Sequence, residues 1–238
     1  MAQQRPLSRD EIAGGAVQQL VQNADPDLVP LSDDERERSL MAILAAHRPG
    51  ADLWVFGYGS LLWNPGMIVS ERRRACLRGF HRRLCLITRV ARGTPERPGL
   101  LLGLDRGGSC EGVALRVPGE RAAAELSILW RREMVDDAYR PSWVRVRAAA
   151  SAGRTETLRC VAFLMERGHR RYAPPLRPVV VAHMVASAAG KFGTCRDYLD
   201  RTMAEFRRMG IRDRHLLRIA ALVHQLAQGE LPGDDATP

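Results

Sequence analysis

The chain has 238 residues, of which 45% are hydrophobic and 26% are charged. This composition excludes disordered, collagenous and coiled-coil proteins, and the length predicts one main domain with extended ends. No stretch approaches the roughly 20 apolar residues that a membrane-spanning helix needs. Residues 1–10 are polar and lack the apolar segment of a secretory signal, so we expect a cytosolic protein without a membrane partner.

The cysteines and histidines give no sign of a metal site or a disulfide framework. The five cysteines and six histidines are scattered, without a C-x-x-C motif or an i, i+4 histidine pair. The formal charge is +9, and a basic run, ERRRACLRGFHRR, occupies residues 71–83. Its arginines alternate with apolar residues and match no nucleic-acid motif. We interpret the run as strand and loop residues with solvated guanidinium groups, and expect no nucleic-acid partner. Attraction of small anions is the alternative.

Residues 1–50 are predicted to form a polar helical extension. Ser8 can cap a helix that runs through about Asn23, and a capping box at Ser32 predicts another helix through His47. The acidic stretch between these helices is predicted to be a solvated connector.

From residue 51 onward, the pattern predicts a domain over 51–228 and a flexible tail over 229–238. Short apolar runs predict strands first and helices later, which is typical of a mixed α+β domain. The sequence Arg106–Ser109 predicts a hairpin turn between two of the strands. The predicted strands are 53–58, 84–88, 100–104, 113–117, 143–148 and 158–165, and the predicted helices are 120–134, 179–189, 195–209 and 213–228.

A loop bracketed by glycines, Gly57-Tyr-Gly-Ser-Leu61, directly follows the first of these strands. Glycines let the backbone turn sharply and approach a ligand, so the N–H groups of Gly59, Ser60 and Leu61 can face one anion. The loop lacks both the G-K-[ST] ending of a phosphate-binding loop and the G-x-G-x-x-G pattern. Ser60 also lacks the context of a nucleophilic serine. The loop is a candidate cradle for a carboxylate, with a simple turn as the alternative.

Helical periodicity places one acidic residue, Glu133, among apolar ones. At about 100° per residue, Leu129 and Trp130 share a face of the predicted helix with Glu133, whereas Glu125 lies on another side. Burial raises the pKa of a carboxyl group toward the range in which it can take and return a proton near neutral pH. The alternative is a glutamate at the helix end that reaches water or pairs with an arginine such as Arg140.

Several motifs, in the same order along the chain, resemble those of the ChaC-type γ-glutamylcyclotransferases. The resemblance covers about residues 52–226. It implies a small mixed β-barrel with flanking helices, and an enzyme that uses no metal or organic cofactor. The motifs are VFGYGSLLWNPG at 55–66, RGTPERPG at 92–99, LDRGGSCEGVALRV at 104–117, LWRREM at 129–134, KFGTCRDYLDRT at 191–202 and MGIRDRHLL at 209–217.

The resemblance also assigns roles to individual residues. It places the catalytic glutamate of the family at Glu133 and a tyrosine near the site at Tyr198, and Cys195 stands where an asparagine is expected. The substrate-binding loop of the family matches Val55, Phe56, Gly57, Tyr58, Gly59, Ser60 and Leu61.

Members of this family cleave glutathione to 5-oxoproline and cysteinylglycine, so the resemblance implies a lyase with glutathione as its small-molecule substrate. We expect the α-amine of the substrate to attack its own γ-carbonyl while Glu133 moves the proton. The loop amides would hold the glutamyl carboxylate or stabilise the oxyanion. The alternatives are a cyclotransferase for other γ-glutamyl amino acids or amines, and a non-catalytic regulatory protein.

Overall fold

The computed structural model describes residues 7–22, 28–150 and 153–230. Three helices precede the barrel: α1 (Arg9–Ala13), α2 (Ala16–Gln22) and α3 (Asp33–Ala45). The single helix predicted from Ser8 is wrong, because the chain breaks at Gly15, where φ is 81°. The predicted end of that helix, Asn23, lies outside the described residues. The capping box at Ser32 is confirmed, since its Oγ accepts a hydrogen bond from the backbone of Glu35.

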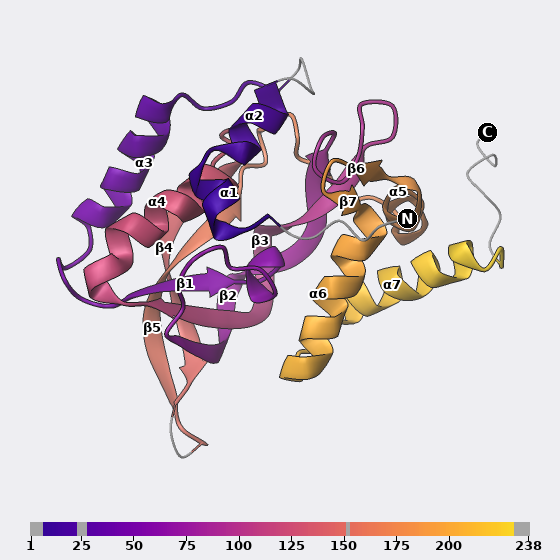
Figure 1. The fold of residues 1–238 in the computed structure, drawn as a ribbon. Coiled ribbons are helices and arrows are strands. Elements are labelled where there is room, and N and C mark those ends of the chain that lie inside the picture. The colour runs from indigo at the N-terminus through magenta and orange to yellow at the C-terminus, as the bar shows by residue number, and fades with distance from the viewer. Residues whose placement is uncertain (1–6, 23–27, 151–152, 231–238) are drawn as a thin grey trace.

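Five strands form a closed barrel in the order β1-β3-β2-β4-β5 (Figure 1). They are β1 (Leu53–Gly57), β2 (Glu71–Thr88), β3 (Gly99–Val117), β4 (Tyr139–Ala149) and β5 (Thr155–Met165). Neighbours in this order pair antiparallel, and the barrel closes through a parallel pairing between β1 and β5. The predicted α+β class and the small barrel with flanking helices are therefore confirmed.

The hairpin turn predicted at Arg106–Ser109 is wrong. Strand β3 runs without a break through these residues, and β2 pairs with it from Glu71 onward. The register shifts where Gly107 and Gly108 adopt φ values of 100° and 67°, which makes this site a β-bulge. The two glycines bend a long ribbon, and the chain reverses instead in residues 89–98, between β2 and β3.

The other helices flank the barrel on two sides (Figure 1). A short 3-10 helix, η2 (Gly119–Arg121), leads into α4 (Ala122–Glu133), which lies beside α1, α2 and α3. On the other side are α5 (Pro178–Ser187), the hairpin of β6 (Ala189–Gly190) and β7 (Gly193–Thr194), α6 (Cys195–Met209) and α7 (Arg214–Ala227).

The prediction for α6 is confirmed at both ends. The helix ends at Gly210, whose backbone is left-handed (φ 65°) and whose N–H donates to the carbonyls of Phe206 and Arg207. No helix in the described part of the chain is long and apolar enough to span a membrane.

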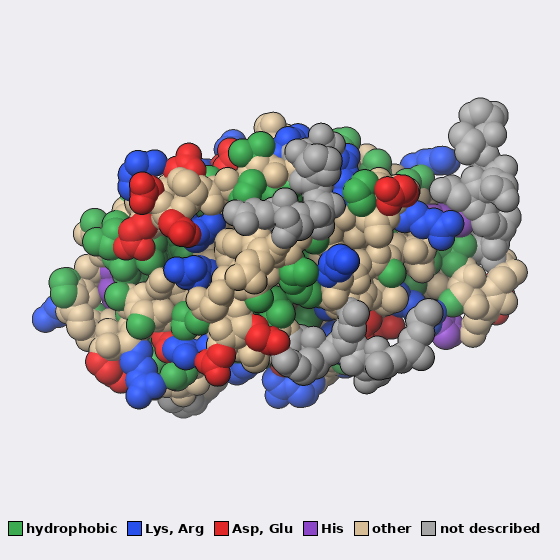
Figure 2. Space-filling model, turned by 45° about the horizontal axis from the view of Figure 1, so that its top comes forward, with side chains coloured by type: hydrophobic (Ala, Val, Ile, Leu, Met, Phe, Trp, Pro, Cys, Tyr) green, Lys and Arg blue, Asp and Glu red, His purple; other side chains and the backbone are tan. Residues whose placement is uncertain are grey.

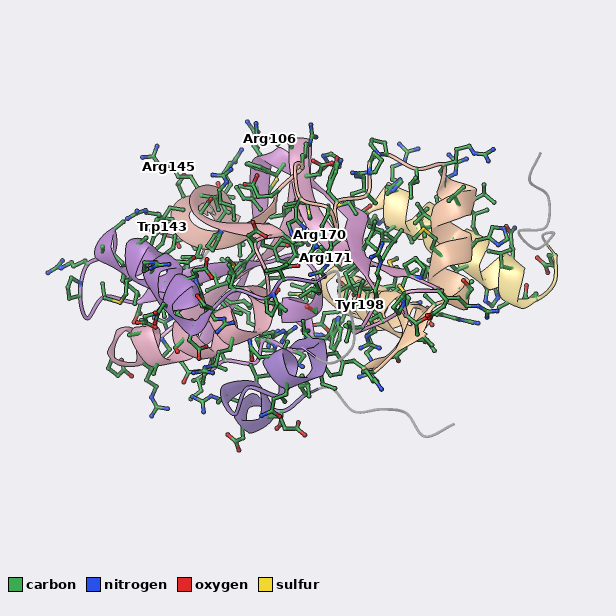
Figure 3. All side chains as sticks on the ribbon, turned by 90° about the horizontal axis from the view of Figure 1, so that it is seen from above. Arg106, Trp143, Arg145, Arg170, Arg171 and Tyr198 are labelled. Atoms are coloured by element: carbon green, nitrogen blue, oxygen red, sulfur yellow. The ribbon has the colours of Figure 1, made fainter. Side chains whose placement is uncertain are left out.

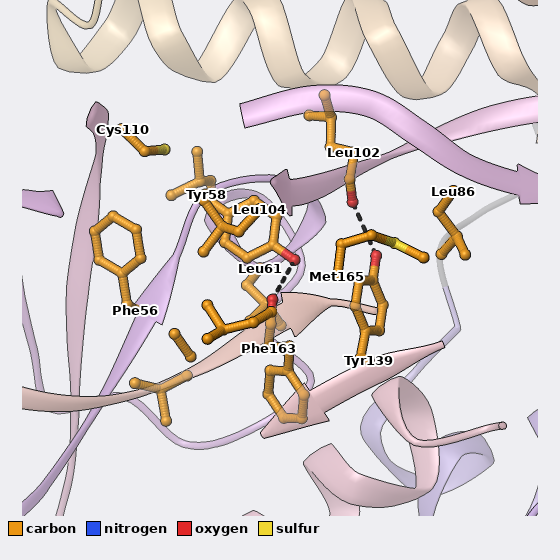
Figure 4. Packing of buried hydrophobic residues seen from close by; sticks show 14 of the residues in the cluster. Phe56, Tyr58, Leu61, Leu86, Leu102, Leu104, Cys110, Tyr139, Phe163 and Met165 are labelled. Carbon is orange, nitrogen blue, oxygen red and sulfur yellow. Dashed lines mark hydrogen bonds between the residues drawn. The ribbon is translucent and has the colours of Figure 1, made fainter. Parts of the chain in front are cut away.

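Two buried tyrosines, Tyr58 and Tyr139, pack within the hydrophobic core (Figure 4). The hydroxyl of Tyr58, just after β1, donates a hydrogen bond to the carbonyl of Phe163 at 3.0 Å. The hydroxyl of Tyr139 donates to the carbonyl of Leu102 at 2.8 Å. A buried tyrosine needs such a partner for its polar end. These bonds fix both rings beside the cavity described below.

The prediction of solvated guanidinium groups in residues 71–83 is wrong for Arg82 and Arg83, which are both buried. Arg82 donates to the carbonyl of Tyr58 at 2.7 Å, and Arg83 donates to Asp105 at 2.9 Å. Basic and acidic side chains are interspersed on the face shown in Figure 2. The arginines of this run therefore contribute to folding as well as to surface charge.

Candidate active site

A cavity of about 190 Å³ lies between the barrel, the end of α4, α6 and the N-terminal helices. It gathers residues from distant parts of the chain, including both features singled out in the sequence. Its polar lining consists of Tyr58, Ser60, Asn64, Thr88, Arg89, Arg92, Arg132, Glu133, Asp136, Tyr139, Arg171 and Tyr198.

Glu133 is the last residue of α4 and lines the cavity. The predicted periodicity is confirmed, because Leu129 and Trp130 are buried on the same helix. The Glu133 side chain is 15% exposed, and its Oε1 lies 3.0 Å from Nε of Arg132. Burial raises the pKa of Glu133 above its ordinary value, and the charge of Arg132 opposes this rise. Arg140, considered as a partner from the sequence, pairs with a different glutamate.

The loop after β1 passes close to the tyrosine of α6. A Cβ atom at Gly59 would lie 3.1 Å from the Tyr198 hydroxyl, so this close approach favours glycine. The chain then forms a 3-10 helix, η1 (Ser60–Leu62). Among the described residues, the N–H groups of Gly59, Ser60 and Leu61 have no hydrogen-bond acceptor. They are available to a bound anion, as N–H groups at the start of a helix commonly are.

The residues assigned by resemblance do not all reach the cavity. Tyr58, Gly59, Ser60, Leu61 and Tyr198 line it together with Glu133. The side chains of Val55 and Phe56 are fully buried in the core, and Gly57 packs against Leu115. These three residues of β1 lie outside the lining and hold the loop in place.

Arg132 connects the loop after β1 with the end of α4. Helical periodicity did not predict this role. Its Nη2 donates to Oγ of Ser60 at 2.8 Å, and its Nη1 donates to the carbonyl of Asn64. Its Nε contacts Glu133. One long side chain therefore ties the loop after β1 to the end of α4 and sets a positive charge beside the glutamate.

Asp136 and Arg171 form a second charged group in the cavity. Asp136 accepts a hydrogen bond from Nη1 of Arg171 at 2.7 Å, and Nε of Arg171 donates to the carbonyl of Ile87. In Figure 3, Arg171 and Tyr198 lie near the middle of the molecule, between the barrel and the C-terminal helices. No local pattern points to Arg171, because tertiary contacts bring it to the site.

Arg92 could have been found from the sequence, since it is the first residue of the RGTPERPG motif that carries the family resemblance. It is buried, and its Nη1 donates to the carbonyl of Thr194 and to Asp197, both at 3.1 Å. Burial lowers the pKa of Arg92, while its hydrogen bond to the carboxylate of Asp197 opposes the change. Arg92 links the loop between β2 and β3 to the start of α6 and places its side chain along the cavity.

The three tyrosines of the cavity are neutral hydrogen-bonding groups. Burial raises the pKa of Tyr58, Tyr139 and Tyr198, and the nearby carboxyl of Glu133 adds to each rise. The Tyr198 hydroxyl accepts a hydrogen bond from the N–H of Leu102 at 3.2 Å. These hydroxyls are fixed polar groups around the glutamate.

Cys195 lies behind the cavity rather than in its lining. Its Sγ donates to the carbonyl of Leu100 at 3.0 Å and accepts from the N–H of the same residue at 3.4 Å. Burial raises the pKa of Cys195 to about 11. The thiol stays protonated at neutral pH and serves as a structural contact between α6 and β3.

The position predicted for Glu125 is wrong, because this residue is 2% exposed. Its carboxylate accepts hydrogen bonds from Arg9 at 2.7 Å and from the N–H of Ile68 at 2.9 Å. Burial favours the neutral form, but these bonds outweigh it and hold the pKa of Glu125 below its ordinary value. Arg9 lies far away in the sequence, so periodicity within α4 could not predict the contact.

Comparisons with known proteins give a consistent result. The family described as "ChaC-like protein" matches residues 53–226. The glutathione-specific gamma-glutamylcyclotransferase of Escherichia coli K12 is 36% identical over 84% of this chain and 85% of its own. The human glutathione-specific gamma-glutamylcyclotransferase 1 is 29% identical over 77% of this chain and 84% of its own.

A solved structure shares the fold. The crystal structure of a gamma glutamyl cyclotransferase specific to glutathione from yeast aligns with a TM-score of 0.67. The alignment covers 74% of this chain and 96% of that chain, at 20% sequence identity. The family match over most of the chain, with the 36% identity to the E. coli relative, shows that the chain belongs to the ChaC-like protein family.

Proposed function

We propose that the protein is a γ-glutamylcyclotransferase that converts glutathione into 5-oxoproline and cysteinylglycine. One observation carries the proposal: the carboxyl group of Glu133 and the glycine loop at Tyr58–Leu61 line the same cavity. A base with a raised pKa and a set of unpaired N–H groups are the two components that this reaction needs. The names of the E. coli and human relatives support glutathione as the substrate.

The reaction is an intramolecular exchange of one C–N bond for another. The α-amine nitrogen of the glutamyl unit attacks the γ-carbonyl carbon and closes a five-membered ring. The bond from that carbon to the cysteinyl nitrogen then breaks, and this nitrogen takes up a proton. Because both reacting groups belong to one molecule, the main tasks of the site are to fold the substrate and to move protons.

Glu133 performs the proton transfer in this proposal. The α-amine is mostly protonated at neutral pH, so it must lose a proton before it can attack. The carboxylate of Glu133 takes that proton and then delivers it to the departing cysteinyl nitrogen. The raised pKa of Glu133 suits both steps, because it makes the carboxylate a stronger base than an ordinary glutamate.

The loop after β1 supplies the complementary charge stabilisation. The N–H groups of Gly59, Ser60 and Leu61 would hold the glutamyl carboxylate or the oxyanion that forms on the γ-carbonyl oxygen. The contact between Arg132 and Ser60 keeps this loop near the glutamate. The close approach of Tyr198 to Gly59 fixes the other side of the loop.

The test is to incubate the purified protein with glutathione and to follow 5-oxoproline and cysteinylglycine by mass spectrometry. The variant Glu133→Gln keeps the shape but removes the base, so we expect a rate loss of about 10² to 10⁴. Glu120→Gln, at an exposed glutamate before α4, is the matched control and should keep full activity. Near-normal release by Glu133→Gln would refute the assignment. A folded wild-type protein that leaves glutathione intact but cleaves γ-glutamyl-alanine would move the activity to other γ-glutamyl compounds.

A further inference from the structure

One wall of the cavity comes from the N-terminal segment, ahead of the range that matches the family. This N-terminal wall consists of six aliphatic side chains. Three of them are buried and three are half-buried, and none of the six carries a polar group. The charged lining residues of the cavity come from other elements. The wall comprises Leu7, Ile12, Val17, Leu20, Val21 and Leu28.

Side-chain contacts hold the helices of this wall against α4. Arg9 forms an ion pair with the buried Glu125 at 2.7 Å. Gln18, on α2, donates a hydrogen bond to the carbonyl of Arg131. That carbonyl belongs to the last turn of α4, where helical partners are missing and an outside donor is needed.

Further contacts fix the chain immediately after Glu133. The N–H of Leu31 donates to the carbonyl of Val135 at 2.9 Å. The buried Arg36 donates through Nε to the carbonyl of Met134 at 3.2 Å. The N-terminal segment is therefore bonded to backbone on both sides of the glutamate and is positioned as part of the site.

We propose that the N-terminal wall is a specificity determinant, which favours substrates whose leaving amino acid has an uncharged side chain. The inference rests on the cyclotransferase activity proposed above. A charged group placed against six aliphatic side chains would lose its water without gaining a partner. The thiol-bearing side chain of a cysteinyl group, or a small apolar side chain, meets no such penalty.

The arrangement of charge in the cavity supports this orientation. The glutamyl end of the substrate carries an ammonium group and a carboxylate, which suit Glu133 and the loop at Gly59. Arg92 and Arg171 lie elsewhere in the lining, paired with Asp197 and Asp136, and a second carboxylate of the substrate would share these guanidinium groups with them. The uncharged part of the substrate that remains is the leaving side chain. The N-terminal wall is an uncharged surface of the cavity that can receive it, alongside apolar lining residues of the barrel such as Leu86 and Leu102.

Adjacent residues offer a matched test. Leu28 lines the cavity, whereas Val29 is 69% exposed. We compare Leu28→Asp with Val29→Asp, using glutathione and γ-glutamyl-lysyl-glycine as substrates. The quantity of interest is the kcat/KM for the lysyl peptide divided by that for glutathione. In Leu28→Asp this ratio should rise at least tenfold over the wild type, because the new carboxylate attracts the lysyl ammonium and repels glutathione. Val29→Asp should leave it unchanged.

A second position guards against a variant that fails to fold. Leu20→Asp should shift the ratio in the same direction, with Gln19→Asp on the exposed side of α2 as its control. Thermal unfolding of each variant shows that it is folded.

An unchanged ratio in the folded leucine variants, or an equal change in their controls, would overturn the inference while the proposed function stands. The same holds for a wild type that cleaves both peptides equally well. A wild type inactive on every γ-glutamyl peptide would overturn the proposed function together with the inference.

Discussion

The substitution Asp105→Asn should strongly destabilise the protein, because Asp105 is the centre of a buried charge network. The residue is 2% exposed. Its Oδ2 accepts hydrogen bonds from Arg83 and from the Tyr172 hydroxyl, both at 2.9 Å. Its Oδ1 accepts from Arg167 at 2.6 Å and from the N–H of Arg106 at 2.8 Å. Asparagine has the same shape, but it carries no charge and turns one acceptor into a donor.

The size of the effect follows from what remains after the substitution. Arg83 is buried and would lose its counter-ion, and breaking a buried pair in this way costs about 3–5 kcal/mol. The same guanidinium keeps a hydrogen bond to the carbonyl of Ala173 at 2.8 Å. We therefore expect the lower end, about 3 kcal/mol, in the free energy of unfolding.

Urea unfolding followed by tryptophan fluorescence measures this change. Arg167→Met is the control, because the Arg167 side chain is 50% exposed and its ion pair with Asp105 is screened by water. Its effect should be far smaller. A loss below about 1 kcal/mol for Asp105→Asn would refute the reasoning, since that is the range of an ordinary surface pair.

The pH dependence gives a second check on the same network. Burial opposes ionisation of Asp105, but the hydrogen bonds from Arg167 and Tyr172 outweigh it and hold its pKa below the ordinary value. Stability from such a group is complete above its pKa in the unfolded chain, about 3.9, and is lost as the pH falls through the folded value. The difference between wild type and Asp105→Asn should therefore shrink in acid. A difference independent of pH would argue against the charge as its source.

Two further predictions concern the cavity. The charge of Arg132 lowers the pKa of Glu133, which burial raises, so Arg132→Met should move the acid limb of the kcat/KM profile to higher pH and lower activity about tenfold at pH 7. The control variant Arg131→Met should leave this limb in place. An acid limb that does not move in Arg132→Met would contradict the prediction. Gly59→Ala would place a Cβ 3.1 Å from the Tyr198 hydroxyl, so we expect KM to rise several-fold in steady-state assays. Gly168→Ala, at a glycine with open space around it, is the control and should behave as wild type. An unchanged KM in Gly59→Ala would show that the loop can shift freely.

Local signals predicted the bounds of α6 and the position of Glu133 on the apolar face of α4. Helix α6 was predicted from Cys195 to Met209 because its apolar stripe and the glycine after it are both local features. The position of Glu133 was predicted in the same way, since its neighbours on the helix define a buried face, whereas its catalytic role stays a prediction. The hairpin turn predicted at Arg106–Ser109 was wrong because a pair of glycines is common both in turns and in β-bulges. Only the pairing of β3 with β2 distinguishes the two.

The rest of the cavity depends on contacts between distant segments. Asp136 and Arg171 meet through the fold, and Glu125 is buried because Arg9 reaches it from the first helix. The N-terminal wall is the largest feature that the sequence could not show, since an amphipathic helix reveals which face it buries but not what it covers. Predicting these contacts requires the tertiary arrangement itself.

The closure of the barrel has a consequence for the order in which a newly made chain becomes active. Strand β1 leaves the ribosome early, yet its partner β5 and the tyrosine that braces the glycine loop are synthesised much later. A nascent chain therefore contains the loop and Glu133 before β5 and α6, which position the loop, have been synthesised. The site is complete only after β5 and α6 have been synthesised and have joined the barrel and the loop.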